Sequence, residues 1–315
     1  MLGGAALLCT GDARRRLGAA TPDALADPPP MNLHPLGDRF LDLQRAALRA
    51  LGTTWIRVTL GLLTDTVASR AYVGAVPNLL GLVSDFHQRT IAARAWPDLV
   101  EATLRRYPEV QRAELLNEPE QFYGLSPASY VRDFLRPGFE RIRERFPDVA
   151  VVAAAPIGNR RQGLDYFRSM TDAGADRYCD YRAVHVYFED ERVLSAFASA
   201  TGRAILVTET GIGAPGQHVR WYTEVMPVIR QALGAELMFW YVLIESAARA
   251  GGGPVPPNYL ATSLIAVQPD ATGQPQAAAG SGLYPLLVSA RRRARAQEPP
   301  GGAGAGGIIT TETRP

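Results

Sequence analysis

Two glutamates, Glu118 and Glu209, each follow a short apolar stretch and could act together as a catalytic pair. Glu118 stands in AELLNEPE, where alternating apolar positions lead to Asn117, and Pro119 then prevents the backbone from continuing a strand or entering a helix interior. Glu209 stands in AILVTETG, which repeats this layout further along the chain. Two carboxyl groups at strand ends can divide proton transfer and nucleophilic attack between them.

The segments around these glutamates alternate between apolar strands and amphipathic helices. Strand-like runs are expected to start near residues 31, 55, 79, 113, 149, 181, 204 and 236. Most intervening segments predict helices, for example one that Asp38 would cap and Gly52 would end, whereas the one between Leu60 and Leu79 is short and poorly patterned. Buried strands that alternate with helices indicate a parallel sheet covered on both faces. Eight strands favour a closed (β/α)8 TIM barrel, an α/β fold, over an open sheet.

A single domain accounts for most of the chain. With 315 residues and 47% hydrophobic content, the chain can bury a full core, and the barrel would take residues 31–292. Residues 1–30 are rich in Ala, Gly and Pro, so we expect a leader or a disordered segment there. After Ser246 we expect a loop and then a closing helix over 283–294, and the Gly, Pro and Ala content predicts a disordered tail over 293–315. We expect a monomer.

The composition excludes several kinds of chemistry. The sequence contains no Lys, so a lysine Schiff base, a pyridoxal phosphate anchor and a P-loop lysine are absent. The net charge of +2 produces no field that would favour nucleic acid. Cys9 and Cys179 are too few and too far apart for a metal site, and His34, His87 and His218 have no metal-ligand spacing. We therefore expect neither a metal nor a cofactor, and we interpret His218 as a surface residue in the first turn of a helix.

The N-terminus leaves the localisation unknown. Its short apolar run is followed, not preceded, by basic residues, which is unlike a secretory signal. Secretion or a place in the cell envelope stays open. Since no apolar run reaches the roughly 18 residues of a membrane span, we expect none.

Four stretches at predicted strand ends together resemble a known enzyme group. These stretches are, in chain order, ELLNEPE, VHVY, ILVTETG and MFWY. Over about residues 31–292 the chain is similar to the retaining glycoside hydrolases of clan A, and most of all to the cellulases and mannanases of family 5. The resemblance implies a TIM barrel that hydrolyses β-glycosidic bonds in a poly- or oligosaccharide, with Glu118 as the general acid/base and Glu209 as the nucleophile.

The resemblance also implies substrate-binding roles for five further residues, namely Asn117, Arg57, His185, Tyr187 and Trp240. Asn117 would hold the sugar 2-hydroxyl, Arg57 and Tyr187 would orient the nucleophile, and His185 would contact the substrate. Trp240 would lie under the reacting sugar, and a cis peptide bond would follow it. The same residue types also fit ordinary structural roles, with His185 and Tyr187 as a core pair and Trp240 as a core residue.

The chemistry sets conditions that do not depend on the resemblance. Retention of configuration needs a carboxylic acid that protonates the leaving oxygen and a carboxylate about 5–5.5 Å away that attacks the anomeric carbon. Arg57 beside Glu209 would keep that carboxylate ionised. An aromatic, partly desolvated pocket and the neighbouring negative charge would raise the pKa of Glu118.

Two other functions must be weighed. The run Gly211–Gly216 reads G-x-G-x-x-G between a strand and a helix, which is the layout of a dinucleotide-binding fingerprint. However, Glu209 would repel the pyrophosphate, and Pro215 removes an amide donor near the helix start. The stronger alternative is a non-catalytic carbohydrate-binding barrel that has lost turnover, because such a protein could keep every residue named above.

Overall fold

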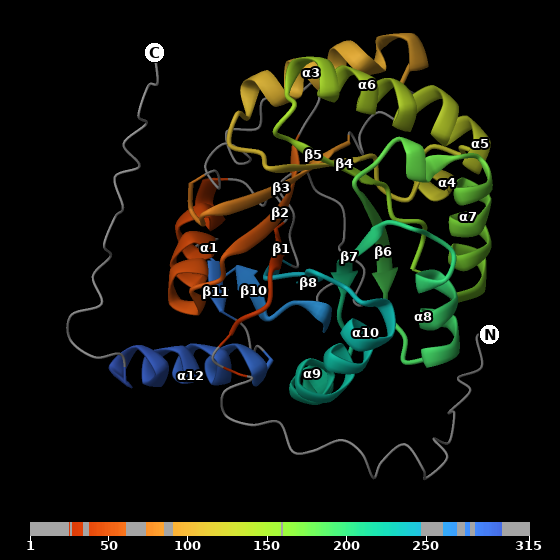
Figure 1. Cartoon of the computed structure of the whole chain (residues 1–315). Helices are drawn as coiled ribbons and strands as arrows, with labels where there is room; N and C mark the ends of the chain where they lie inside the picture. Colours follow the sequence, from red (N-terminus) through yellow and green to blue (C-terminus); the bar gives the residue numbers. More distant parts are fainter. Residues whose placement is uncertain are drawn as a thin grey trace, which may run out of the picture.

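The protein forms a closed barrel of eight parallel strands with helices around it (Figure 1). The computed structural model describes residues 25, 27–33, 38–60, 74–84, 91–158, 160–246, 261–269, 275–277 and 281–297. The barrel strands are β1 (Met31–Leu33), β2 (Trp55–Leu60), β3 (Asn78–Val83), β4 (Arg112–Leu115), β5 (Ala150–Ala153), β6 (Tyr181–Val186), β7 (Ala204–Thr210) and β8 (Met238–Trp240). Each strand pairs with the next, and β1 closes the barrel on β8 through Met31 and Trp240. The TIM-barrel prediction is confirmed.

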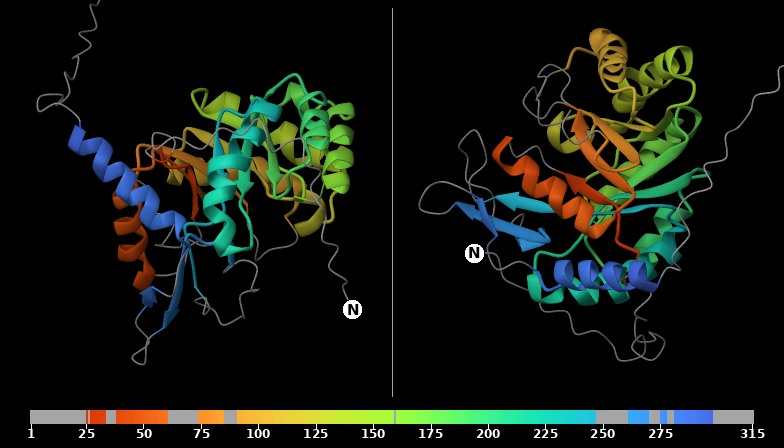
Figure 2. Two further views of the ribbon diagram at one scale, coloured as in Figure 1. Left: turned by 90° about the horizontal axis from the view of Figure 1, so that it is seen from below. Right: turned by 90° about the vertical axis from the view of Figure 1, so that its left-hand side faces the viewer.

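Helices cover the outside of the barrel (Figures 1 and 2). The longer ones are α1 (Asp38–Leu51), α3 (Trp96–Arg106), α6 (Arg136–Arg145), α7 (Arg160–Asp172), α8 (Glu191–Ala198), α10 (Met226–Leu233) and α12 (Leu283–Gln297). Short helices are α4 (Pro119–Phe122), α5 (Pro127–Tyr130) and α9 (His218–Arg220), and π-helical turns at Val131–Leu135 and Trp221–Val225 join α5 to α6 and α9 to α10. Single 3-10 turns cover Ala93–Ala95, Ala175–Arg177 and Pro215–Gln217. None of the helices in the described ranges is long and apolar enough to cross a membrane.

The helix ends follow local sequence signals. Gly52 ends α1 with a φ of 71°, a left-handed conformation that glycine adopts without a steric penalty, and its amide donates to the Leu48 carbonyl at 2.8 Å. Helix α12 packs beside α1 and continues to Gln297, past the boundary at residue 292 that the sequence predicted for the barrel. The helix expected between Leu60 and Leu79, most of the expected leader, and residues 298–315 of the expected tail lie outside the described residues.

A small second sheet follows the barrel where the sequence predicted only a loop. Strands β9 (Ile244–Ser246) and β10 (Ile265–Pro269) pair in parallel, and β11 (Pro275–Ala277) pairs with β10 in the antiparallel sense. The Leu264 amide donates to the Val242 carbonyl at 3.0 Å, which joins this sheet to the chain leaving β8. Leu264, Ile265 and Val267 are buried, so their apolar side chains account for the strand.

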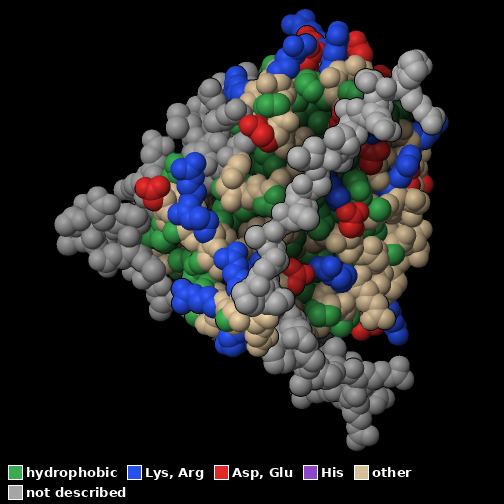
Figure 3. Space-filling model, turned by 60° about the vertical axis from the view of Figure 1, so that its left-hand side comes forward, with side chains coloured by type: hydrophobic (Ala, Val, Ile, Leu, Met, Phe, Trp, Pro, Cys, Tyr) green, Lys and Arg blue, Asp and Glu red, His purple; other side chains and the backbone are tan. Residues whose placement is uncertain are grey.

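Side chains fill the barrel interior in layers. At the amino end of the strands, the Arg112 guanidinium lies 4.7 Å from the ring centroid of Trp55 and 4.4 Å from that of Tyr181. The next layer is apolar and consists of Leu80, Val152, Ala155, Ala183, Leu206 and Phe239. Toward the carboxyl end, buried polar groups replace the apolar ones, and these lead to the barrel mouth. On the outer surface, arginine and acidic side chains are interspersed over the face shown in Figure 3.

Candidate active site

Glu209 points into the barrel because β7 contains a β-bulge. Pairing with β6 matches Val184 to Val207 and then His185 to Glu209, which leaves Thr208 as the extra residue. The Thr208 and Glu209 side chains consequently both turn inward: each forms a hydrogen bond with another buried polar side chain. Strict alternation along β7 would have sent one of them to the outer face.

Glu118 reaches the same space through an irregular backbone after β4. Leu116 and Glu118, on either side of Asn117, have φ angles of 71° and 41°, a left-handed conformation that is costly for residues other than glycine. Two hydrogen bonds hold this backbone against the segments on either side of it. The Leu116 amide donates to the Val83 carbonyl, and the Glu118 amide donates to the Ala155 carbonyl, both at 3.0 Å. Pro119 then begins α4, so the strand stops at the point where the carboxylate is presented.

Arg57 is the centre of a buried polar layer beneath the two glutamates. Its Nε donates to Glu114 Oε2 at 2.6 Å, and its Nη2 donates to Asn117 Oδ1 at 2.7 Å. Its Nη1 donates to Asn32 Oδ1 and to Glu209 Oε1, both at 2.9 Å. Burial alone would lower the pKa of this guanidinium, but the Glu114 and Glu209 carboxylates raise it above its usual value. Arg57 therefore carries a permanent positive charge at the base of the site.

Glu209 is held in its ionised form. Its Oε2 accepts a hydrogen bond of 2.8 Å from the Tyr187 hydroxyl, in addition to the bond that Oε1 accepts from Arg57. Burial acts to raise the pKa of Glu209, but the charges of His185 and Arg57, with the hydrogen bonds from Tyr187 and Arg57, lower it below its usual value. Although Tyr187 is 36% exposed as a residue, burial of its hydroxyl and the Glu209 charge raise its pKa well above the usual value, so it remains a donor.

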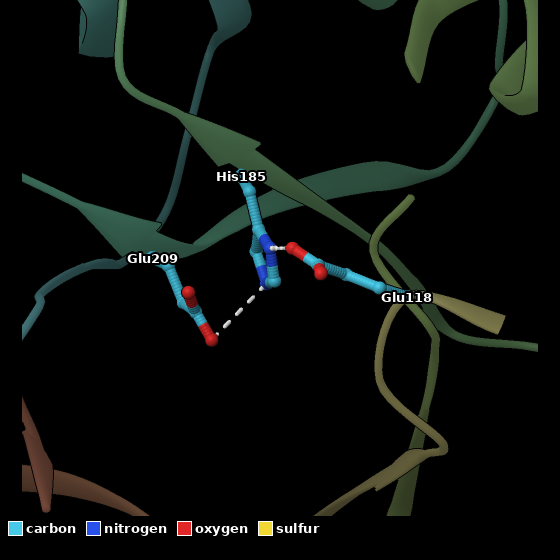
Figure 4. A group of neighbouring side chains, drawn as sticks. All are labelled: Glu118, His185 and Glu209. Atoms are coloured by element: carbon cyan, nitrogen blue, oxygen red, sulfur yellow. Dashed lines mark hydrogen bonds and ion pairs between the residues drawn. The ribbon is translucent and has the colours of Figure 1, made fainter. Parts of the chain in front are cut away.

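The His185 imidazole lies between the two glutamates (Figure 4). Its Nδ1 is 2.8 Å from Glu118 Oε1, and its Nε2 is 3.5 Å from Glu209 Oε1. Burial would lower the pKa of His185, but Glu209 and Glu118 raise it. One ligand atom of each residue, including one oxygen of each carboxylate, lies within 4.8 Å of the other two. Two carboxylates and an imidazole in this arrangement could perform acid/base and nucleophilic chemistry, and they could also hold a cation.

The structure does not bring Trp240 to the mouth. Trp240 is fully buried, its Nε1 donates to the Thr262 carbonyl at 3.0 Å, and its ring packs edge-on against His218 at 5.1 Å. Because Phe239 lies in the interior layer, alternation along the chain sends Trp240 outward and the next residue, Tyr241, inward. The platform position expected for Trp240 is therefore wrong, as is the expected cis peptide bond after it, since the cis bond joins Tyr241 to Val242.

Tyr241 takes the position at the mouth that was expected for Trp240. Its ring packs edge-to-face against Tyr187, with centroids 6.3 Å apart and an interplanar angle of 88°. Alternation in the run MFWY separates Phe239 and Tyr241 from Trp240, but alternation alone does not reveal which face is the interior. The resemblance assigned the mouth position to the tryptophan of this run, whereas the structure places Tyr241 there.

Three further polar residues of the site were missed in the sequence, namely Asn32, Glu114 and Thr208. Each is less than 4% exposed and hydrogen-bonds another member of the polar layer. The available signal was a charged residue, Glu114, inside an apolar strand, because a carboxylate there needs a buried partner. His218 was also misjudged: it is fully buried, and burial lowers the pKa of its imidazole.

No family model matches the chain, and no curated protein is similar to it in sequence. Solved structures nevertheless share its fold. A family 39 glycoside hydrolase from Bacteroides cellulosilyticus WH2 matches with a TM-score of 0.60 and 15% identity, over 85% of this chain and 64% of that one. A β-mannanase from Thermomonospora fusca matches with a TM-score of 0.53 and 13% identity, over 76% and 83% of the two chains. AbfB, a family 51 α-L-arabinofuranosidase from Bifidobacterium longum, matches with a TM-score of 0.53 and 11% identity, over 86% and 73%.

The chain thus spans less than two thirds of the family 39 structure. At identities between 11% and 15%, the likeness concerns the fold. The resemblance to clan A is supported at that level, whereas no family within the clan is singled out. The chain has a TIM-barrel fold, which it shares with these solved glycoside hydrolases.

Proposed function

We propose that the protein is a retaining glycoside hydrolase of clan A that cleaves β-glycosidic bonds in a poly- or oligosaccharide. One observation carries the proposal: an oxygen of Glu118 and an oxygen of Glu209 lie within 4.8 Å of each other at the carboxyl ends of the barrel strands. Carboxyl groups of retaining enzymes are about 5–5.5 Å apart, whereas inverting enzymes need about 6.5–9.5 Å to admit a water molecule. The short separation therefore supports retention.

The surroundings of the two glutamates support a division of roles. Glu209 accepts hydrogen bonds from Arg57 and Tyr187, which favour the ionised form that a nucleophile needs. Glu118 instead contacts the His185 imidazole, a group that can itself donate or accept a proton, which suits a general acid/base. Glu209 is accordingly the nucleophile and Glu118 the general acid/base.

In the first step, a Glu209 oxygen attacks the anomeric carbon while Glu118 donates its proton to the leaving glycosidic oxygen. The C–O bond to the leaving group breaks, and a covalent glycosyl-enzyme forms at Glu209. In the second step, Glu118 takes a proton from water, whose oxygen attacks the same carbon and releases Glu209. Asn117 contributes by position: its Oδ1 accepts from Arg57, so its amide NH2 is available to the sugar 2-hydroxyl.

The structural neighbours are described as a β-mannanase, an α-L-arabinofuranosidase and a β-xylosidase from Caulobacter crescentus, so their activities differ. We further propose that the protein acts on a polysaccharide in the manner of cellulases or mannanases. We also propose that it acts as a monomer. The bound partner would be a carbohydrate.

The test is hydrolysis by the purified chain on aryl β-glucoside, β-mannoside, β-xyloside and α-L-arabinofuranoside, and on β-glucan, β-mannan and β-xylan. The wild type and a Glu236→Ala control should release product, because Glu236 contacts Arg112 at the opposite end of the barrel. Glu209→Ala should release none. NMR of the first product should show the anomeric configuration of the substrate.

Two results would count against the proposal. Unchanged hydrolysis by Glu209→Ala, or an inverted product, would remove Glu209 as the nucleophile. Carbohydrate binding by a folded wild type without hydrolysis of any substrate in the panel would instead favour the carbohydrate-binding barrel without turnover.

A further inference from the structure

One nitrogen of the His185 imidazole is buried without a hydrogen-bond partner. His185 is 2% exposed, and among the described residues its Nε2 has no acceptor or donor within hydrogen-bonding geometry. The nearest charged atom is Glu209 Oε1, at 3.5 Å. Buried polar atoms are nearly always satisfied, so an orphaned ring nitrogen that faces a carboxylate points to a missing ligand.

Glu118 determines which nitrogen of this ring is free. When the imidazole carries its proton on Nδ1, this nitrogen donates to Glu118 Oε1 at 2.8 Å, and the Nε2 lone pair is directed toward Glu209 (Figure 4). Histidines that bind metals through one nitrogen characteristically donate the other N–H to a carboxylate, which fixes the tautomer and increases the basicity of the ligand. Glu118 and His185 already have this arrangement.

The spacing between His185 and Glu209 suits a metal better than a hydrogen bond. A separation of 3.5 Å is long for an N–H···O contact, whose usual range ends near about 3.2 Å. Nitrogen and oxygen ligands of a tetrahedral Zn²⁺ are each about 2.0–2.1 Å from the ion, which places them about 3.4 Å apart. The observed gap therefore matches one edge of such a coordination sphere.

The charge of the buried cluster also favours a dication. Three carboxylates meet there, those of Glu114, Glu118 and Glu209, and Arg57 supplies one positive charge. A histidine that binds a metal gives up its extra proton, so in the metal-bound state the imidazole is neutral and the protein charges sum to −2. The Arg57 charge is shared between Glu114 and Glu209, so it does not cancel this excess. A divalent cation would neutralise it without a further counterion.

We propose that Zn²⁺, or a divalent ion of similar ligand preference, binds between His185 Nε2 and Glu209 Oε1, with water completing its coordination. Imidazole and carboxylate are both ligands of such ions. The ion binds the Glu209 carboxylate, which could then not attack the sugar, so the site is inhibitory and not catalytic. Only this inhibitory consequence rests on the proposed function, because ion binding itself needs no turnover.

Isothermal titration calorimetry with ZnCl2, on protein freed of metal by a chelator and gel filtration, tests binding directly. The wild type should bind one ion per chain. His185→Gln and Glu209→Gln should each lose affinity by about tenfold or more, since each removes one protein ligand. Circular dichroism and thermal unfolding would show that both variants are folded.

The double substitution His34→Gln/His87→Gln provides the control, because it removes two of the chain's four histidines, neither of which is a proposed ligand. Its affinity should equal that of the wild type. Failure of the wild type to bind zinc, or equal affinity in the folded His185→Gln and Glu209→Gln variants, would overturn the proposal.

Inhibition is measured with whichever substrate the wild type hydrolyses. Zinc should suppress hydrolysis competitively, and a chelator should restore it. Hydrolysis that needs added zinc would overturn the inhibitory role. Hydrolysis without zinc binding would defeat the metal inference alone, and site-specific zinc binding without any hydrolysis would defeat the proposed function alone.

Discussion

The carboxylate of Glu114 lies against the guanidinium of Arg57, with Oε2 2.6 Å from Nε. Glu114 is fully buried, and its other oxygen accepts a hydrogen bond of 3.2 Å from the Thr208 hydroxyl. Glu114 therefore fixes the plane of the guanidinium from within the barrel, while the opposite edge of Arg57 reaches Glu209 and Asn117. Arg57, which hydrogen-bonds the proposed nucleophile Glu209, is thus itself held by a second carboxylate.

Glu114→Gln should destabilise the fold by about 3–5 kcal/mol, because it keeps the side-chain shape but removes one charge of a buried ion pair. Urea unfolding measures the change. The control is Glu236→Gln, whose carboxylate pairs with Arg112 but whose side chain is 45% exposed, and it should cost no more than about 1 kcal/mol. Equal losses in the two variants would show that Glu114 does not hold Arg57 in place.

Tyr187→Phe should move the acidic limb of the pH profile of kcat/KM toward higher pH. The Tyr187 hydroxyl is one of the groups that lower the pKa of Glu209, so its removal lets that pKa rise. A nucleophile with a depressed pKa is active above that value and loses activity as pH falls through it. The rate at neutral pH should also fall, by about tenfold, from the loss of a hydrogen bond to a charged group.

The matched control for Tyr187→Phe is Tyr181→Phe, because Tyr181 begins β6 and Tyr187 directly follows the carboxyl end of that strand. Tyr181 packs against Arg112 at the amino end of the strands, far from the two glutamates. Its substitution should therefore leave the pH profile of kcat/KM unchanged. An acidic limb that is the same in Tyr187→Phe and in the wild type would remove Tyr187 from the set of groups that tune Glu209.

The sequence was sufficient to predict the barrel and to predict that residues from several strands meet at one mouth. Buried strands repeat at regular intervals with amphipathic helices between them, and in a parallel barrel the carboxyl ends of all strands meet at one mouth. Residues on different strands, such as Arg57, Glu118 and Glu209, could therefore be expected together without knowledge of their contacts. The observed hydrogen bonds join Arg57 to Glu209, and His185 lies between the two glutamates.

The sequence predicted the directions of individual side chains less well than it predicted the fold, and the reason is physical. Period-two alternation assigns faces only while the strand stays regular, and the two strands that carry the glutamates do not. The bulge at Thr208 turns two consecutive residues of β7 inward, and the left-handed Leu116 resets the alternation after β4. The bulge contains no glycine or proline that would mark it, so Thr208 was missed. In the regular strand β8 the reason is different: alternation separates Trp240 from Tyr241 without showing which of them faces the interior.

Trp240→Phe and Tyr241→Ala should separate a core role from a site role. Trp240→Phe loses the hydrogen bond from Nε1 to the Thr262 carbonyl, so the free energy of unfolding should fall by about 1–2 kcal/mol while kcat/KM of the folded enzyme stays unchanged. Tyr241→Ala removes the aromatic ring beside Tyr187, so kcat/KM should fall by about tenfold. The reverse pattern, with kcat/KM altered only by Trp240→Phe, would mean that Trp240 and not Tyr241 lies under the reacting sugar.

Glu118→Gln should impair hydrolysis according to the leaving group. A glutamine cannot donate the proton that a sugar or alkyl leaving group needs, so kcat for such substrates should fall by about 10²–10⁴-fold. A dinitrophenyl glycoside has a leaving group that departs without protonation, so the formation of its glycosyl-enzyme, followed as the burst of phenolate, should stay near the wild-type rate. Glu120→Gln is the matched control, because Glu120 lies two residues away and accepts a hydrogen bond from the Ile157 amide at 2.6 Å. That variant should treat both substrates alike, and the same indifference in Glu118→Gln would mean that Glu118 is not the acid.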